Sequence, residues 1–208
     1  MGVFGGTFDP VHYGHLRSAL ELVERLQLQQ LRLMPCAVPP HRDKPACDAV
    51  HRVAMVELAV AGEPHLACDS RELEREGPSF TIDSLLDLRA ELGSGHSLSL
   101  VMGCDAVLGI TGWHRWQELL DLAHVVVIAR PGWNLPAAGP VSDWLLTHRE
   151  EDRNTLRQRP SGGILIEELR PLAISSTEIR KLLAAGRSAR YLLPQAVLDY
   201  IQTHDLYH

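Results

Sequence analysis

The strongest constraint on the fold is a series of short apolar runs that recur along the chain, separated by longer amphipathic segments. Most of these runs are continuously apolar and do not alternate with polar residues, which is typical of strands buried on both faces of a parallel sheet. The segments between them repeat apolar residues at helical spacing, for example Leu16, Ala19, Val23 and Leu26. The pattern therefore predicts an α/β fold with right-handed crossovers and a doubly wound, mainly parallel sheet.

The apolar runs also place the predicted elements along the chain. Strands are expected at Gly2–Gly5, Leu31–Pro35, His65–Cys68, Leu98–Met102, Val125–Ala129 and Ile164–Glu168. Besides the segment just described, helical spacing occurs at Val53–Ala59 and Ile82–Leu88, and again at Pro194–Thr203, where Pro194 suits a first turn. The stretch from Pro131 to Gly162 has the weakest pattern, and we expect a surface excursion with one short helix near Val141–Thr147.

Composition excludes several classes of protein. A chain of 208 residues with 45% hydrophobic and 22% charged residues predicts one folded domain over residues 1–208. A net charge of −6 without a basic stripe argues against a nucleic-acid partner. No signal peptide and no apolar stretch of ~20 residues is visible, so we expect a cytoplasmic protein without a membrane partner. The four cysteines form no C-x-x-C pair, which favours reduced thiols over a metal site.

A glycine-rich segment, Gly5–His15, joins the first predicted strand to the first helix and reads G-G-T-F-D-P-V-H-Y-G-H. Its two leading glycines allow positive φ and close approach of the backbone to a ligand. A helix that begins near Gly14 directs free N–H groups and the positive end of its dipole at an anion. His12 and His15 can turn both rings toward that ligand and donate to phosphate oxygens. A lone H-x-x-H would favour two surface histidines, but the length of the pattern favours a phosphate site.

A second segment, Ile174–Arg180, reads I-S-S-T-E-I-R. Ser175 and Glu178 have the spacing of a capping box, and the two flanking isoleucines have that of a hydrophobic staple. The segment therefore predicts a helix start with spare hydroxyl groups and with Arg180 close by, which suits phosphate. Taken alone, an ordinary capped helix with a solvated arginine is the better interpretation.

Together the two segments resemble the nucleotidyltransferase superfamily with the H-x-G-H signature, and more closely the bacterial nicotinate mononucleotide adenylyltransferases. Gly5–His15 matches that family's G-G-T-F-D-P-x-H-x-G-H stretch residue for residue, and Ile174–Arg180 matches its I-S-[ST]-T-x-I-R. The resemblance, which runs from Gly2 to about Tyr207, implies a Rossmann-like fold. The segment from about residue 171 would carry the second phosphate motif and the closing helices.

The resemblance also implies an activity. The adenylyl group of ATP would pass to nicotinate mononucleotide, giving nicotinate adenine dinucleotide and pyrophosphate for NAD biosynthesis. Mg²⁺ would arrive with ATP, held mainly by phosphates and water, and no metal site made by protein side chains is predicted.

The resemblance further assigns residues to two halves of one site. The ATP half would comprise Gly5, Gly6, Thr7, Phe8, His12, His15, Arg42, Gly103, Asp105, Ile174, Ser175, Ser176, Thr177 and Arg180. Four of these would be catalytic: His12 and His15 would contact phosphate oxygens, and Arg42 and Arg180 would contact the β/γ end of ATP. The mononucleotide half would comprise Thr81, Ile82, Asp105, Trp113, His114 and Arg130.

The residues alone leave alternatives for several of these roles. Arg42 follows tandem prolines in an extended loop and could be a solvated cation. Asp105 follows the fourth strand, where such a sheet has its crevice, but it could instead cap a helix. Ser79 or Thr81 could likewise be a cap, and Trp113 could be a core residue as well as a stacking platform for a pyridinium ring.

Two kinds of alternative function remain at this point. The same chemistry could use nicotinamide mononucleotide, phosphopantetheine or a cytidylyl donor. The phosphopantetheine enzymes of the superfamily are shorter and lack the features at Pro78–Thr81 and Trp113. A non-catalytic nucleotide sensor is the alternative from another class, and the presence of both histidines and Arg180 argues against it. The sequence leaves a homo-oligomer open.

Overall fold

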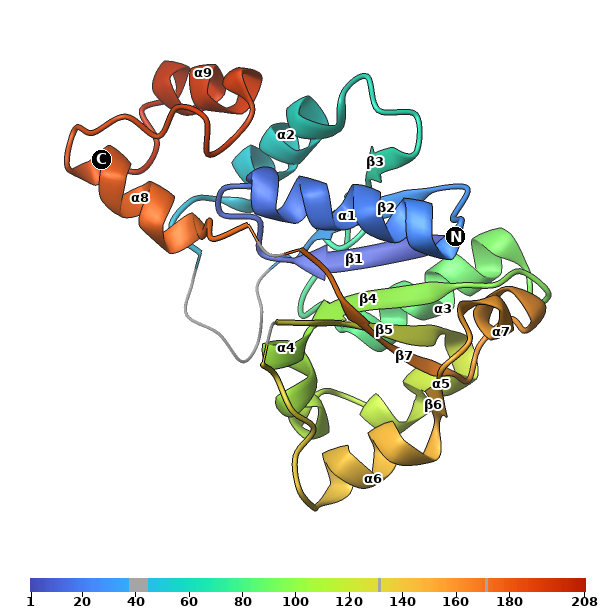
Figure 1. The fold of residues 1–208 in the computed structure, drawn as a ribbon. Coiled ribbons are helices and arrows are strands. Elements are labelled where there is room, and N and C mark those ends of the chain that lie inside the picture. The colour runs from blue at the N-terminus through green and yellow to red at the C-terminus, as the bar shows by residue number, and fades with distance from the viewer. Residues whose placement is uncertain (38–44, 131, 171) are drawn as a thin grey trace.

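The computed structural model describes residues 1–37, 45–130, 132–170 and 172–208. Within them, seven parallel strands form one sheet in the order β3-β2-β1-β4-β5-β7-β6 (Figure 1). The strands are β1 (Gly2–Gly6), β2 (Leu31–Pro35), β3 (Leu66–Cys68), β4 (Ser99–Gly103), β5 (His124–Ala129), β6 (Arg149–Glu150) and β7 (Ile164–Glu168). The predicted doubly wound parallel sheet is confirmed, and each of the six predicted strands forms within one residue of its expected ends.

Helices cover both faces of this sheet (Figure 1). They are α1 (Tyr13–Leu26), α2 (Ala49–Val60), α3 (Thr81–Leu92), α4 (Cys104–Leu108), α5 (Leu119–Leu122), α6 (Pro140–Thr147), α7 (Arg153–Gln158), α8 (Ser176–Ala184) and α9 (Gln195–Thr203). Short 3₁₀ turns occupy Ile110–Gly112 and Trp116–Glu118. In the described part of the chain, no helix has both the length and the apolar character needed to cross a membrane.

The continuous apolar runs fill both faces because successive side chains of a strand point to opposite sides. Val3 packs with the core formed by α3, α4, α5 and α6, whereas its neighbour Phe4 packs with the core of α1, α2, α8 and α9. Val125 and Val126 in β5 divide in the same way. Two apolar layers therefore enclose the sheet, which explains why the strands lack polar alternation.

The region after β5 holds more structure than its composition predicts. The short helix expected near Val141–Thr147 is confirmed as α6, but a surface excursion for the rest is wrong. β6 adds an edge strand beside β7, and α7 buries Leu156 against the α1 side of the sheet. A strand of two residues is too short for any periodicity, and a polar helix that buries one leucine has no apolar stripe.

The strand order locates the crevice of the sheet. β1 pairs with β2 on one side and with β4 on the other, so the chain winds away from this point in both directions. Such a switch point leaves a crevice outside the carboxyl ends of the two central strands. Gly5–His15 and Gly103–Asp105 follow those ends, so the fold brings the first motif and the fourth-strand residues to one edge.

Candidate active site

A cavity of about 1340 Å³ lies at this edge, outside the carboxyl ends of β1 and β4. Arg42 falls outside the described residues, and the side chain of Ile82 is buried in the core under α3. All the other predicted site residues line the cavity: Gly5, Gly6, Thr7, Phe8, His12, His15, Thr81, Gly103, Asp105, Trp113, His114, Arg130, Ile174, Ser175, Ser176, Thr177 and Arg180.

His12 is the N-cap of α1, and this position fixes which ring nitrogen can reach a ligand. Its Nδ1 accepts a hydrogen bond from the Gly14 N–H at 3.1 Å. A neutral ring that accepts through Nδ1 carries its proton on Nε2. The free Nε2–H is therefore the group that His12 can offer to an oxygen atom of a ligand.

His15 lies directly against His12. The two rings stack with centroids 3.8 Å apart and planes at 26°, and Phe8 meets His15 edge-on at 5.0 Å. The Nδ1 atom of His15 is buried and has no partner among the described residues. The two imidazoles thus form one stacked pair at the start of α1, and both line the cavity.

Burial keeps both histidines neutral. Desolvation lowers the pKa of His12 to about 4. Desolvation, and then repulsion from His12, lowers the pKa of His15 to about 3. Because both values lie far below neutral pH, both rings are neutral in the ligand-free protein and can offer a phosphate hydrogen bonds without carrying a charge.

The turn that precedes the histidines differs from prediction in one respect. The left-handed residue is Phe8, with φ of 49°, and neither leading glycine has positive φ. A Cβ atom on Gly6 would lie 2.8 Å from the Phe8 ring, so Gly6 makes room for that ring. A Cβ atom on Gly5 would meet nothing within 4 Å. Gly5 therefore keeps space open in the cavity, and the expected close approach of backbone to ligand falls on this residue.

The second motif docks onto the first. Ser175 is the N-cap of α8 and accepts from the Glu178 N–H at 3.2 Å, which confirms the predicted cap. The Ser176 hydroxyl donates to the Pro10 carbonyl at 2.9 Å. Arg180 donates to the Asp9 carbonyl at 2.6 Å. Two helix starts from opposite parts of the sequence thus face the same cavity.

The expected mononucleotide half lies along α3 and α4. Neither Ser79 nor Thr81 caps α3, because the N-cap is Phe80, and the Ser79 hydroxyl accepts from Arg75 at 2.6 Å. Thr81 and Ile82 instead open the helix, where their N–H groups have no intrahelical partner.

Asp105 lies in the first turn of α4 and is not its N-cap, which is Gly103. Its carboxylate pairs with Arg130 at 2.7 Å, and both side chains are largely exposed. Trp113 lines the cavity and also packs against the core on the α3 side. Both interpretations of Trp113, stacking platform and core residue, therefore agree with its position.

Sequence reasoning missed the part played by Asp9. Its buried carboxylate accepts from the Tyr207 hydroxyl and from the Ala46 N–H, both at 2.7 Å. The signal was a carboxylate inside an apolar turn, but local spacing gave no hint of partners so distant in the chain.

Two buried charges on neighbouring elements were also missed. Arg52 is fully buried on α2, and Glu72 is buried before α3. Both bind the backbone of Ala37, directly after β2. Arg52 shares the helical spacing of the buried Met55 and Val56, so a cation at a core position was the available signal.

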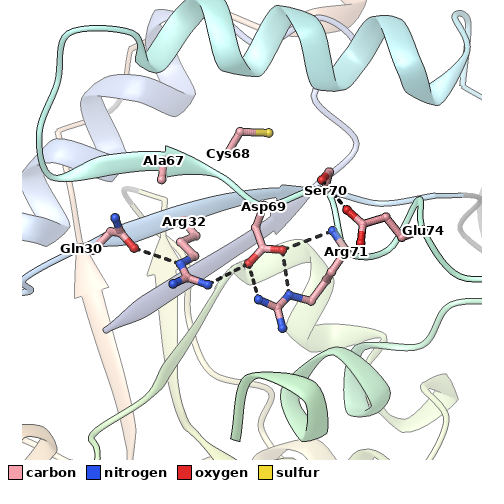
Figure 2. Close-up of a pocket in the computed structure, with 8 residues that line it drawn as sticks. All are labelled: Gln30, Arg32, Ala67, Cys68, Asp69, Ser70, Arg71 and Glu74. Atoms are coloured by element: carbon pink, nitrogen blue, oxygen red, sulfur yellow. Dashed lines mark hydrogen bonds and ion pairs between the residues drawn. The ribbon is translucent and has the colours of Figure 1, made fainter. Parts of the chain in front are cut away.

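A second hollow, of about 540 Å³, lies beside β2 and β3 and has a different character. Figure 2 shows Arg71 binding Asp69 through two nitrogens, at 2.7 and 2.8 Å, with Arg32 reaching the same carboxylate at 3.3 Å. The Glu91 carboxylate on α3 accepts a hydrogen bond from each arginine at 2.8 Å, and these bonds lower the pKa of Glu91 to about 2. These charges satisfy one another, so the cluster joins the strands to α3 and leaves no free cation for a ligand.

Known proteins similar to this chain share its length and its fold. A family model described as cytidylyltransferase-like matches residues 3–182. A probable nicotinate-nucleotide adenylyltransferase of Pseudomonas putida (strain W619) is 52% identical over 207 residues, which is 100% of this chain and 94% of the relative. A protein of the same name from Cellvibrio japonicus is 50% identical and is covered to 98%.

Among solved structures, the nicotinic acid mononucleotide adenylyltransferase of Plasmodium falciparum complexed with NaAD superposes with a TM-score of 0.72. It is 19% identical, and the match covers 99% of this chain and 96% of that one. At this identity the likeness concerns the fold, and it confirms the Rossmann-like architecture that was expected.

Proposed function

The chain belongs to the nicotinate-nucleotide adenylyltransferase family, and from that premise we propose that it transfers the adenylyl group of ATP to nicotinate mononucleotide. The products are nicotinate adenine dinucleotide and pyrophosphate, a step of NAD biosynthesis. The observation that carries this proposal is the cavity in which the starts of α1 and α8 meet. Its two helix dipoles and its buried hydrogen-bond donors suit a triphosphate.

The reaction needs alignment more than it needs a reactive side chain. A 5′-phosphate oxygen of the mononucleotide attacks the α-phosphorus of ATP, and a bond forms between them. The bond from the α-phosphorus to the bridging oxygen breaks, and pyrophosphate leaves with that oxygen. No enzyme nucleophile takes part, so the protein positions two anions and stabilises the charge on the α-phosphate.

The ATP half supplies donors at defined places. His12 donates through Nε2–H, and His15 supports it from the stacked ring or donates in turn. Arg180 and Arg42 neutralise the β- and γ-phosphates, and Thr177 adds a hydroxyl group at the start of α8. The Ser176 hydroxyl is bonded to the Pro10 carbonyl, so Ser176 offers its backbone N–H. Because the histidines are uncharged at neutral pH in the ligand-free protein, the arginines provide the positive charge that meets ATP in this half.

The mononucleotide half recognises the sugar and the pyridine ring. Asp105 binds ribose hydroxyls, and Trp113 stacks on the pyridinium, which is attracted to the indole face. The free N–H groups of Thr81 and Ile82 at the start of α3, together with the backbone of His114, bind polar groups of the nucleotide. Arg130, now paired with Asp105, lies close enough to assist.

Mg²⁺ fits this site as a companion of ATP. In the described part of the chain, no three His, Cys, Asp or Glu side chains are grouped to hold a metal ion. The Asp9 carboxylate already binds Tyr207 and Ala46 and lies 3.7 Å from the Arg180 guanidinium, which offsets its charge. Phosphate oxygens and water would hold the ion, which would lower the negative charge of the triphosphate.

A pyrophosphate-release assay tests the function. Purified protein with ATP, Mg²⁺ and nicotinate mononucleotide should release one pyrophosphate for each dinucleotide formed, and omission of the mononucleotide should abolish release. Parallel rates with nicotinamide mononucleotide decide between acid and amide, and phosphopantetheine serves as a foreign acceptor. ATP binding without any product would favour the sensor and would contradict the proposal.

Three further expectations from the sequence remain predictions. They are a single domain over residues 1–208 closed by the segment from about residue 171, the cytoplasmic location, and the absence of a nucleic-acid partner. A homo-oligomer also stays open.

A further inference from the structure

Arg52 is a buried cation directly behind the wall of the cavity. Only 1% of its surface is exposed, and it lies on the core-facing side of α2. Its Nη1 donates to the Thr7 carbonyl and its Nη2 to the Ala37 carbonyl, each at 2.8 Å. One guanidinium therefore joins the first turn of the cavity to the chain that leaves β2.

None of the ion pairs among the described residues involves Arg52, and its Nε atom has no hydrogen-bond partner there. The buried carboxylate of Asp69, by contrast, is paired with Arg71. A buried, unpaired charge is costly, because it loses its hydration without a matching counter-charge. An anion that enters the cavity would supply a counter-charge on the far side of the turn from Arg52.

The bond from Arg52 to Thr7 also sets the direction of a peptide group. A trans peptide points its C=O and its N–H in opposite directions. Since the Thr7 carbonyl faces Arg52, the Phe8 N–H points away from Arg52. Phe8 holds a left-handed φ of 49°, which is unfavourable for a bulky residue. The arginine therefore anchors a strained turn whose residues line the cavity.

Ala37 is held from both sides of its backbone. Arg52 binds its carbonyl, and Glu72 accepts from its N–H at 3.4 Å. Glu72 in turn receives the Ser84 hydroxyl on α3 at 3.0 Å. Arg52 thus belongs to a buried set of contacts that fixes where the chain departs from β2.

We propose that Arg52 is a positioning residue for ATP: it fixes the Thr7–Phe8 peptide at the phosphate-binding turn and places a permanent positive charge behind it. The proposal rests on the proposed function in that it takes this turn to receive the triphosphate. Arg52 does not line the cavity, so it acts through the turn and through its field and makes no contact with ATP.

The test compares Arg52→Met, which removes the charge and both bonds, with Arg52→Lys, which keeps the charge but loses the forked geometry. The KM for ATP should rise about tenfold or more in Arg52→Met and by less in Arg52→Lys. The KM for the mononucleotide should change by less than about twofold in both variants.

Arg89→Met is the matched control. Arg89 also donates to backbone carbonyls, those of Leu122, His96 and Pro160 at 2.5–2.6 Å. It lies in the last turn of α3, at the amino ends of the strands, whereas the cavity lies outside their carboxyl ends. This variant should lower thermal stability and leave both KM values unchanged. If Arg52→Met behaves in the same way, the positioning role is refuted.

Calorimetric titration with ATP and Mg²⁺, run beside an assay of dinucleotide formation, separates this proposal from the proposed function. Wild-type protein that forms no dinucleotide contradicts the function, whereas unchanged ATP affinity in the Arg52 variants contradicts the role of Arg52. If Arg52→Met does not fold, Arg52→Lys carries the test, and an unchanged ATP affinity in that variant overturns the proposal.

Discussion

At the scale of single residues, substitution of the two adjacent glycines of the first turn should have opposite effects on stability. Gly5→Ala should leave the free energy of unfolding within about 0.5 kcal/mol of wild type, because its Cβ atom meets nothing within 4 Å. The same methyl group fills space in the cavity, so the KM for ATP should rise. Gly6→Ala should lose about 1–3 kcal/mol, since its methyl group would lie 2.8 Å from the buried Phe8 ring.

Urea unfolding and steady-state kinetics on both glycine variants check this pair. A loss of stability in Gly5→Ala, or wild-type stability in Gly6→Ala, would contradict the surroundings described for these two glycines.

His15→Ala tests the stacked imidazole pair. Turnover should fall by about 10²–10³-fold, the usual cost of losing one preorganised donor in a transition state. The fold should persist, because the ring lies at the cavity wall. His96→Ala, at an exposed position, is the control and should keep wild-type turnover. Near-normal turnover of His15→Ala would remove this residue from the mechanism.

The residues of the cavity were predictable where the signal is local. Gly5–His15 and Ile174–Arg180 encode a helix start together with its ligand-facing side chains, so spacing and resemblance place them well. Arg52 was not predictable as a partner of Thr7, because 45 positions separate them and only the folded chain shows the contact. The same holds for Tyr207 and Asp9, which are 198 positions apart.

At the scale of elements, the segment after α9 is attached to the first turn by one hydroxyl. Tyr207→Phe removes the donor to the buried Asp9 carboxylate, which should cost about 1–3 kcal/mol because a buried charged acceptor loses one of its hydrogen bonds. Tyr191→Phe, at a residue that is 84% exposed, is the matched control. Equal unfolding free energies of the two variants in urea would contradict the attachment.

Elements with a strong apolar pattern were predicted closely, and weakly patterned ones were not. The inner strands are apolar on both faces, so the continuous apolar runs of the sequence are enough to locate them. β6 and α7 depend on pairing with β7 and on one buried leucine, which are tertiary facts. In Figure 1, α9 lies next to α2, and this neighbour relation likewise appears only in the folded chain.

At the scale of the whole molecule, the neutral histidines make stability depend on pH. The pKa values of His12 and His15 in the folded state, about 4 and about 3, lie below the value of 6.5 for an unperturbed histidine. Unfolded chains therefore bind more protons below pH 6.5, and acid favours unfolding. Stability should be full above pH 6.5 and should fall as the pH drops toward 4, by up to about 1.4 kcal/mol per pH unit for each ring.

Urea unfolding at pH 7.5, 6.5, 5.5 and 4.5 measures this effect. His15→Gln should lose less unfolding free energy than wild type between pH 6.5 and 4.5, whatever the difference between the two proteins at pH 7.5. Equal slopes for the two proteins would show that His15 is not the titrating group.

The bonds of Ser176, Arg180 and Tyr207 to residues 9 and 10 also have a consequence for synthesis on the ribosome. At ~5–20 residues per second, translation of the intervening stretch takes on the order of ten to forty seconds. During that time the nascent chain exposes its opening turn without the partners that complete it. The cavity that we propose for ATP is therefore completed only after residues 176–207 have emerged.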